Sequence, residues 1–215
     1  CGFSQIDNEE GTLTGLKNIE SYGSGSLLKM TVNYENDSPK KGFWIVTNKH
    51  VLEAESILNK EFAGNYKVTA SECDISFPNS NKIYTVKYTK APDWRTNPEG
   101  AIWFGGEIST SITQDVGYIK LDMVDDYITK NAINSICVGD VEIGEKLIIL
   151  GYPTIGSTEN ITVTEGIVSG REEDYYVTSA KIDRGNSGGA AILLSRNCYL
   201  GLPTFTVVGL AESLG

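Results

Sequence analysis

The stretch "DRGNSGGAA" at residues 183–191 places a single serine, Ser187, among three glycines and directly before an apolar run. A serine hydroxyl is a weak nucleophile at neutral pH and needs a neighbouring base to take its proton. Attack on a carbonyl also needs backbone N–H groups aimed at the oxygen that becomes negative, and glycine leaves such groups accessible. The stretch therefore indicates either an exposed nucleophile beside an oxyanion hole or a plain glycine-rich turn that leads into a strand.

The base for such a nucleophile is commonly a histidine, and the chain contains only one, His50. His50 follows the apolar run "GFWIVTN" at residues 42–48, so it lies at the end of an expected strand, where a rigid scaffold can present a functional residue. The alternative is an ordinary surface or core histidine. We interpret His50 as the candidate base.

An orienting carboxylate is needed to fix the imidazole tautomer and to stabilise its charged form. The candidates are Asp93, Asp115, Asp122, Asp125 and Asp126. Asp115 is the best of them because it opens the alternating segment "DVGYIKL" at residues 115–121. The three aspartates at positions 122–126 lie on a polar segment that is typical of a solvated surface.

Short segments of alternating apolar residues recur between turn signals such as "ENDSPKKG", "FPNSN" and "NPEGA", and this pattern predicts an all-β sandwich or a pair of barrels. The expected strands cover residues 26–34, 42–48, 82–89, 116–121, 146–152, 160–170, 174–181, 190–194 and 198–205. Only two short segments, 50–61 and 123–134, have helical character. The second is expected to bridge two halves, which we divide into a domain of residues 1–130 with His50 and Asp115 and a domain of residues 131–215 with Ser187.

Composition excludes several classes of protein. The chain has 215 residues, 40% of them hydrophobic, and no apolar run of about 18 residues that would predict a membrane-spanning helix. The formal net charge of −10 argues against a nucleic-acid partner, because phosphates need a basic surface. Four widely separated cysteines without a CxxC pair, together with one histidine, make a zinc site improbable. The cysteines fit two disulfides or ordinary buried thiols equally well. We expect no metal and no cofactor.

Three segments together carry a family resemblance. "VTNKHVL" at 46–52, "DVGYIKL" at 115–121 and "DRGNSGGAA" at 183–191 occur in the order His, Asp, Ser and resemble the motifs around the triad of trypsin-like serine proteases. "GEKLIILGYP" at 144–153 and "TVTEGIVSG" at 162–170 resemble the high-temperature-requirement (HtrA) branch and related bacterial peptidases. The resemblance covers roughly residues 22–215. It implies the chymotrypsin fold, which is two packed antiparallel β-barrels with the active site in the cleft between them.

The resemblance also implies roles for individual residues. His50 would be the general base, Asp115 its orienting partner and Ser187 the nucleophile, and the N–H groups of Gly185 and Ser187 would form the oxyanion hole. The chain lacks an "IVGG"-like start, and Asn186 stands where zymogen-forming relatives have an aspartate. We therefore expect activity without N-terminal cleavage, with order supplied by neighbouring loops or by a regulatory partner. We expect no PDZ module after this domain.

The substrate-binding residues implied by the resemblance are Lys181, Ile182, Leu202, Pro203 and Thr204. Lys181 offers no acidic floor for a basic side chain, so Ile182 would narrow the pocket for small or aliphatic residues. In the alternative, Lys181 would accept an acidic residue. We expect residues 198–205 to line the substrate channel and 206–213 to close the barrel, the alternative being that 207–213 line the channel.

The leading hypothesis is a serine endopeptidase that acts on polypeptides through an acyl-enzyme intermediate. The alternatives are a catalytically inactive peptide-binding module on the same fold and a serine esterase. An α/β-hydrolase is disfavoured because the alternating strand–helix pattern of that fold is missing.

Overall fold

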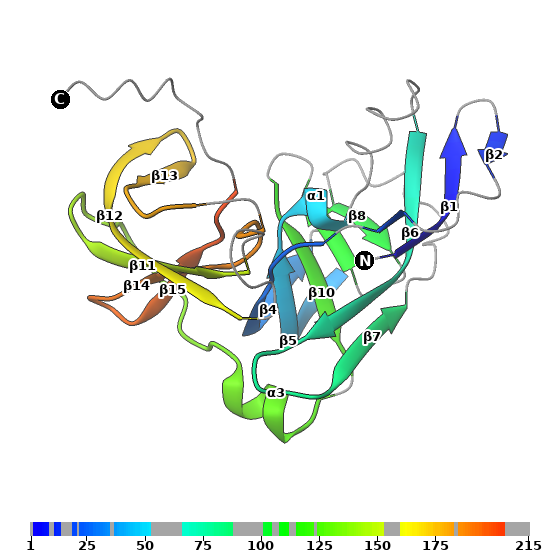
Figure 1. The fold of residues 1–215 in the computed structure, drawn as a ribbon, viewed down its shortest axis with the longest axis horizontal. Coiled ribbons are helices and arrows are strands. Elements are labelled where there is room, and N and C mark those ends of the chain that lie inside the picture. The colour runs from blue at the N-terminus through cyan, green and yellow to red at the C-terminus, as the bar shows by residue number, and fades with distance from the viewer. Residues whose placement is uncertain are drawn as a thin grey trace.

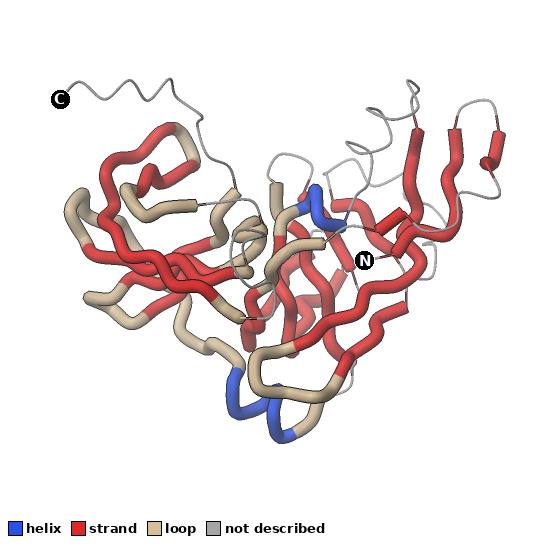
Figure 2. The backbone as a smooth tube through the Cα atoms, in the orientation of Figure 1, coloured by secondary structure: helices blue, strands red, loops and turns tan. Residues whose placement is uncertain are grey.

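The computed structural model shows three antiparallel five-stranded sheets, with strand as the dominant element (Figures 1 and 2). The structure describes residues 2–8, 11–13, 19–20, 22–34, 37–52, 66–87, 101–104, 108–111, 115–122, 124–152, 160–182 and 185–204. Among them, no helix is long and apolar enough to cross a membrane.

The sheet that carries the candidate base has the strand order β4-β5-β10-β9-β8. Its members are β4 (Ser26–Tyr34), β5 (Asp37–Thr47), β8 (Ala101–Phe104), β9 (Ile108–Ser111) and β10 (Gly117–Leu121). Alternate residues of β10 are buried, as the sequence pattern predicts for a strand with one face on a core. Ile45 of β5 pairs with Leu27 on one side and with Ile119 on the other, so three neighbouring strands deliver apolar side chains to the same core.

A second sheet covers that core from the other side. It consists of β1 (Gly2–Asn8), β2 (Gly11–Leu13), β3 (Ile19–Glu20), β6 (Tyr66–Ser76) and β7 (Ile83–Lys87). Cys73, Tyr84 and Val86 of this sheet join Leu27, Ile45 and Ile119 in one buried cluster. The two sheets therefore enclose a common core, as the inner faces of a barrel do.

The third sheet has the order β13-β12-β11-β14-β15. It contains β11 (Lys146–Gly151), β12 (Thr162–Glu172), β13 (Tyr175–Thr178), β14 (Ala190–Leu193) and β15 (Cys198–Gly201). The sheet curls strongly in Figure 1 and has a core of its own around Leu147, Ile149, Val168 and Leu193. The candidate nucleophile lies in the loop that leads into β14.

A short connecting segment joins the two halves. Helix α3 (Asp126–Asn131) begins at Asp125, whose carboxylate accepts a hydrogen bond from the Ile128 N–H, and Ile128 is completely buried in the first core. The chain then pairs with β4, where Ile133 exchanges two backbone hydrogen bonds with Leu27 and Lys29. Further on, Ser135 and Cys137 bond to the backbone of Tyr199 in β15. One segment therefore fastens β4 to β15.

Most of the expected strands are confirmed, with ends that differ by a few residues. The segment at 37–41 was predicted as a turn but forms the first half of β5, because β4 and β5 pair down to Tyr34 and Asp37. The strands β1, β2, β3, β6, β8 and β9 were not predicted. Of the first expected helix, at 50–61, the structure describes residues 50–52, which belong to α1 (Lys49–Leu52). Asp125 is not simply solvated, since it caps α3 and also binds Lys82 and Tyr84.

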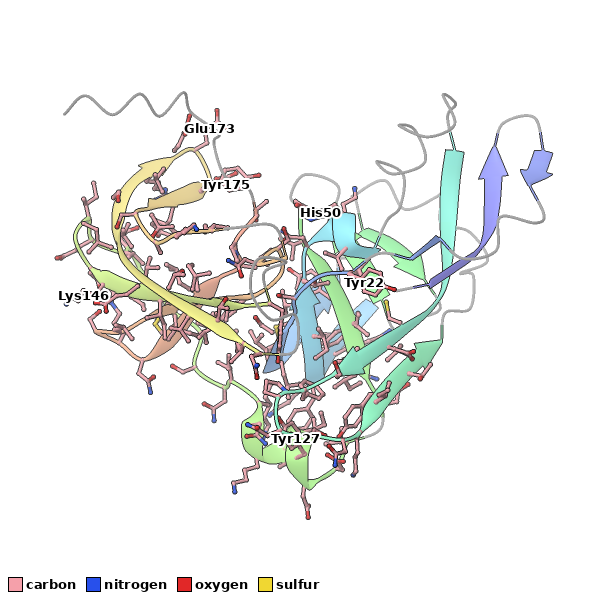
Figure 3. All side chains as sticks on the ribbon, in the orientation of Figure 1. Tyr22, His50, Tyr127, Lys146, Glu173 and Tyr175 are labelled. Carbon is pink, nitrogen blue, oxygen red and sulfur yellow. A yellow bond between two sulfur atoms is a disulfide. The ribbon has the colours of Figure 1, made fainter. Side chains whose placement is uncertain are left out.

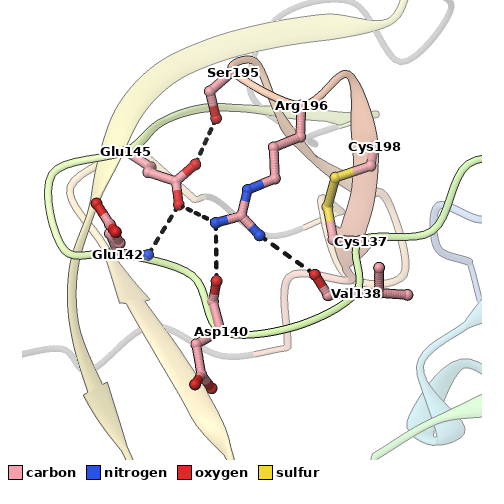
Figure 4. The surroundings of a disulfide bond; sticks show 8 residues. All are labelled: Cys137, Val138, Asp140, Glu142, Glu145, Ser195, Arg196 and Cys198. Atoms are coloured by element: carbon pink, nitrogen blue, oxygen red, sulfur yellow. Dashed lines mark hydrogen bonds and ion pairs between the residues drawn. A yellow bond between two sulfur atoms is a disulfide. The ribbon is translucent and has the colours of Figure 1, made fainter.

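Of the two possibilities for the cysteines, disulfides or buried thiols, the structure shows disulfides. Cys137 and Cys198 are bonded, with their Cα atoms 5.0 Å apart, and Cys73 is disulfide-bonded as well. Beside the Cys137–Cys198 bridge, Arg196 donates to the carbonyls of Val138 and Asp140 and pairs with Glu145 (Figure 4). The bridge and this arginine fasten the β14–β15 turn to the loop before β11.

Candidate active site

His50 lies where strand β5 ends and the short helix α1 begins. Thr47 and Asn48 are buried, and α1 begins at Lys49. Val51 and Leu52 are both buried and Leu52 belongs to the first core, whereas His50 keeps 45% of its side chain exposed. Figure 3 shows His50 on the side of the first half that faces the second half. A rigid strand end therefore holds an accessible imidazole.

Asp115 reaches His50 because of the register between β5 and β10. Gly117 pairs with Thr47, and continuing this antiparallel register brings Asp115 opposite the first turn of α1. The Nδ1 atom of His50 lies 2.7 Å from Oδ2 of Asp115, and the His50 backbone N–H donates to Oδ1 at 3.0 Å. Asn48 Nδ2 donates to the Asp115 carbonyl at 2.8 Å and fixes the aspartate backbone.

The charge state of Asp115 suits this contact. Partial burial raises the pKa of the Asp115 carboxyl, but the hydrogen bonds from the His50 ring and the His50 backbone N–H outweigh burial and hold that pKa below its ordinary value. An ionised carboxylate accepts hydrogen bonds only, so Nδ1 must carry the proton of a neutral imidazole. The lone pair of such a ring is then on Nε2, the nitrogen that is free to act as a base.

Ser187 lies on a turn with two glycines in left-handed conformations, Gly185 at φ +94° and Gly188 at φ +81°. A Cβ atom at Gly188 would overlap the Ser24 carbonyl and the Thr47 hydroxyl, so glycine permits the turn to approach the end of β5. To the residues that the structure describes, Ser187 Oγ makes no hydrogen bond and the N–H groups of Gly185 and Ser187 donate none. The turn thus offers a hydroxyl and two backbone donors.

The expected substrate-binding residues lie in two segments. The Lys181 side chain is exposed, its carbonyl accepts from Thr164, and Ile182 packs half-buried against the core of the third sheet. Leu202 packs against the apolar cluster between the halves, and the Pro203 carbonyl accepts from the Gly188 N–H at 3.3 Å. Thr204 Oγ1 accepts from Asn48 Nδ2 at 3.3 Å. The segment 202–204 therefore runs beside both the serine turn and the histidine turn.

Sequence reasoning missed three polar residues that hold the site together, namely Ser24, Thr47 and Asn48. Each is buried and hydrogen-bonded to the backbone of another element. The signal that could have found Ser24 is "GSGS" at residues 23–26, where glycines flank a serine much as they flank Ser187. Thr47 and Asn48 had a weaker signal, two polar residues at the end of an apolar run.

Two solved structures resemble this chain, and the first of them supports the fold. A serine endoprotease from Yersinia pestis matches with a TM-score of 0.55 and 22% identity over 94% of this chain and 53% of that chain. An HtrA-type protease, AlgW, solved with a decapeptide, matches with a TM-score of 0.46 and 18% identity over 89% of this chain and 56% of that one. This chain thus spans about half the length of these solved chains. No curated protein matches it.

The sequence model of the trypsin-like peptidase domain matches residues 23–202, a range that contains every strand from β4 to β15 together with His50, Asp115 and Ser187. The chymotrypsin fold expected from the sequence is confirmed by this match and by the first structural neighbour. The chain belongs to the trypsin-like peptidase domain family.

Proposed function

We propose that this chain is a serine endopeptidase that hydrolyses peptide bonds through an acyl-enzyme intermediate. The observation that carries the proposal is the contact of the sole histidine with Asp115, with Nδ1 2.7 Å from the carboxylate oxygen. This contact leaves Nε2 as the basic nitrogen, and the turn that carries Ser187 packs against Thr47, three residues before His50. A histidine with a purely structural role has no need of that arrangement.

In the proposed reaction, Ser187 Oγ attacks the substrate carbonyl carbon while His50 Nε2 takes the hydroxyl proton. Asp115 stays ionised, holds the ring tautomer and stabilises the imidazolium that forms. The carbonyl oxygen becomes negative and accepts hydrogen bonds from the N–H groups of Gly185 and Ser187. His50 then returns the proton to the leaving amine, and water releases the acyl group by the same steps in reverse.

For the substrate pocket, we keep the sequence-based proposal that small or aliphatic side chains are preferred. The half-buried position of Ile182 and the exposed side chain of Lys181 support it. The alternative is a preference for an acidic residue that pairs with Lys181. Cleavage rates of two peptides that differ only in having alanine or glutamate before the scissile bond distinguish the two preferences.

We also propose that the chain divides into a domain of residues 1–130 and a domain of residues 131–215; the buried cluster in each half supports this division. We further propose that the protein is active without N-terminal cleavage. Support for the second point comes from Asn186, which is uncharged and only 3% exposed, and from hydrogen bonds that hold the serine turn from within the fold. A regulatory protein partner would act on the same turn.

A fluorophosphonate probe tests the proposal, because it phosphonylates a serine only when a base activates that serine. We expect label on Ser187, none on Ser187→Ala, and loss of peptide cleavage in that variant with the unfolding midpoint unchanged. Absence of label on the wild type would favour the inactive peptide-binding module. Label with hydrolysis of esters but not of peptides would favour the esterase.

A further inference from the structure

Ser24 lies in the segment before β4 and connects more parts of the site than any other described residue outside the predicted triad. It is buried, with 4% of its surface exposed. Its N–H donates to the Ser187 carbonyl at 2.9 Å, and its hydroxyl donates to the Gly185 carbonyl at 2.6 Å. The same hydroxyl accepts from the Tyr152 N–H at 2.8 Å, and the Ser24 carbonyl accepts from Thr47 Oγ1 at 2.7 Å.

These partners belong to three separate elements. Gly185 and Ser187 are in the serine turn, Tyr152 follows β11 of the third sheet, and Thr47 ends β5 three residues before His50. Through one side chain and its own peptide groups, Ser24 therefore ties the turn to the strand end that presents the histidine.

The contacts determine which way the peptide groups of the turn point. The Gly185 carbonyl is held by the Ser24 hydroxyl, the Asn186 carbonyl accepts from the Gly189 N–H at 2.9 Å, and the Ser187 carbonyl is held by the Ser24 N–H. Three consecutive peptide planes are thus fixed, because each carbonyl shares its plane with the N–H of the next residue. The Ser187 N–H lies in the middle plane, opposite the Asn186 carbonyl that the Gly189 N–H holds, and Ser24 holds the peptide plane on either side of it.

We infer that Ser24 is a positioning residue that keeps the Gly185–Ser187 turn in the form that binds an oxyanion. The inference rests on the proposed function, since it assigns a support to the proposed oxyanion hole. Replacing Ser24 by alanine keeps both of its backbone contacts but removes the hydroxyl, and leaves the Gly185 carbonyl and the Tyr152 N–H without that partner. The Gly185–Asn186 peptide then loses its only described hydrogen bond and is free to rotate.

The test compares Ser24→Ala with Ser26→Ala. Ser26 is a matched control because it is two residues away, equally buried at 5% exposed, and makes none of the contacts to the serine turn. Two readouts are measured on the full chain. Hydrogen exchange of peptides that cover residues 183–190 reports the order of the turn. Acylation of Ser187 by cinnamoylimidazole reports the chemistry, through its rate and through the infrared stretching frequency of the acyl carbonyl.

We expect Ser24→Ala, but not Ser26→Ala, to exchange faster over residues 183–190. We expect its acylation rate to fall by about 10- to 100-fold, below the loss for deleting an oxyanion-hole donor outright. Its acyl carbonyl should absorb at a higher frequency, because weaker hydrogen bonds polarise the carbonyl less. A general loss of stability would not move that frequency.

Two results would overturn the inference: unchanged exchange over residues 183–190, or an acyl carbonyl frequency equal to that of the wild type. If wild-type Ser187 takes no acyl group, the proposed function fails by itself. The exchange measurement then still decides whether the Ser24 hydroxyl orders the turn, with faster exchange in Ser24→Ala in favour and equal exchange against.

Discussion

Asp115 holds His50 through two hydrogen bonds, one to the ring at 2.7 Å and one to the backbone N–H of the same residue at 3.0 Å. The carboxylate therefore fixes both the position of the turn and the orientation of the imidazole. Since the two contacts use different oxygens, an amide in place of the carboxylate cannot accept from both the ring and the backbone N–H: its oxygen would accept from the N–H, and its NH2 group would face Nδ1, which then has to be an acceptor.

Asp115→Asn is expected to lower kcat for peptide hydrolysis by about 10⁴-fold, because the amide stabilises the wrong ring tautomer. Asp122→Asn is the matched control, since Asp122 lies just after β10, is 53% exposed and pairs with Lys120. The measurement is the rate of fluorophosphonate labelling together with kcat on one peptide. Equal rates for the two variants would show that Asp115 does not orient the base.

The lowered pKa of Asp115 also predicts how stability depends on pH. The unfolded carboxyl titrates at about pH 4, so on acidification the unfolded chain takes up the proton first. The stabilisation from this contact is complete above about pH 4 and is lost as the pH falls through the lower pKa of the folded state. Urea unfolding of the wild type and of Asp115→Asn from pH 3 to pH 6 checks this. We expect the difference in unfolding free energy to shrink toward pH 3; a constant difference would exclude the coupling.

Gly188→Ala is expected to destabilise the fold and to abolish labelling of Ser187. The alanine would have to adopt φ +81°, and its Cβ would overlap the Ser24 carbonyl and the Thr47 hydroxyl. Gly139→Ala separates the two effects, because Gly139 has φ +76° but open space around it. That control should lose about 1–2 kcal/mol from the backbone alone and keep its labelling rate. If the two variants had equal stability and equal labelling rates, the close approach of Gly188 to Ser24 and Thr47 would not be the reason that glycine is needed there.

A functional residue could be predicted from the sequence where its signal lies in the residues beside it in the chain. His50 and Asp115 could be proposed as partners because one follows an apolar run, the other opens an alternating strand, and both lie in segments that resemble family motifs; all three signals are properties of neighbouring residues. Ser24 was missed because its partners are 23 to 163 residues away in the chain, and nothing local marks a serine whose hydroxyl will meet a distant carbonyl. The pairing of Cys137 with Cys198 likewise depends on the contact of the connecting segment with β15, which spacing does not encode.

Removal of the Cys137–Cys198 bridge should lower the free energy of unfolding by about 2–4 kcal/mol, because the bridge restrains an unfolded chain over a separation of 61 residues. The double variant Cys137→Ala/Cys198→Ala, compared with the wild type by urea unfolding without reductant, provides the measurement. The contacts of Arg196 to the Val138 and Asp140 carbonyls remain and should keep the β14–β15 turn in place. No loss of stability would mean that these contacts alone hold the two segments together.

Asn186→Asp tests whether an amino terminus orders the serine turn. Asn186 is 3% exposed, and its side-chain oxygen has no hydrogen-bond partner among the described residues and packs against Gly151. A carboxylate there would be buried without a counter-charge, so we expect a loss of about 3–5 kcal/mol at pH 7 relative to the exposed control Asn134→Asp. Burial would raise the pKa of the new carboxyl in the folded state, which then binds the proton more tightly than the unfolded state does. The deficit should therefore shrink as the pH falls from 7 to 4, and urea unfolding across that range measures it.

If a cleaved amino terminus did insert beside this position, the aspartate would gain an ion pair, and Asn186→Asp would be as stable as the control and would label faster than the wild type. That outcome would contradict activity without N-terminal cleavage.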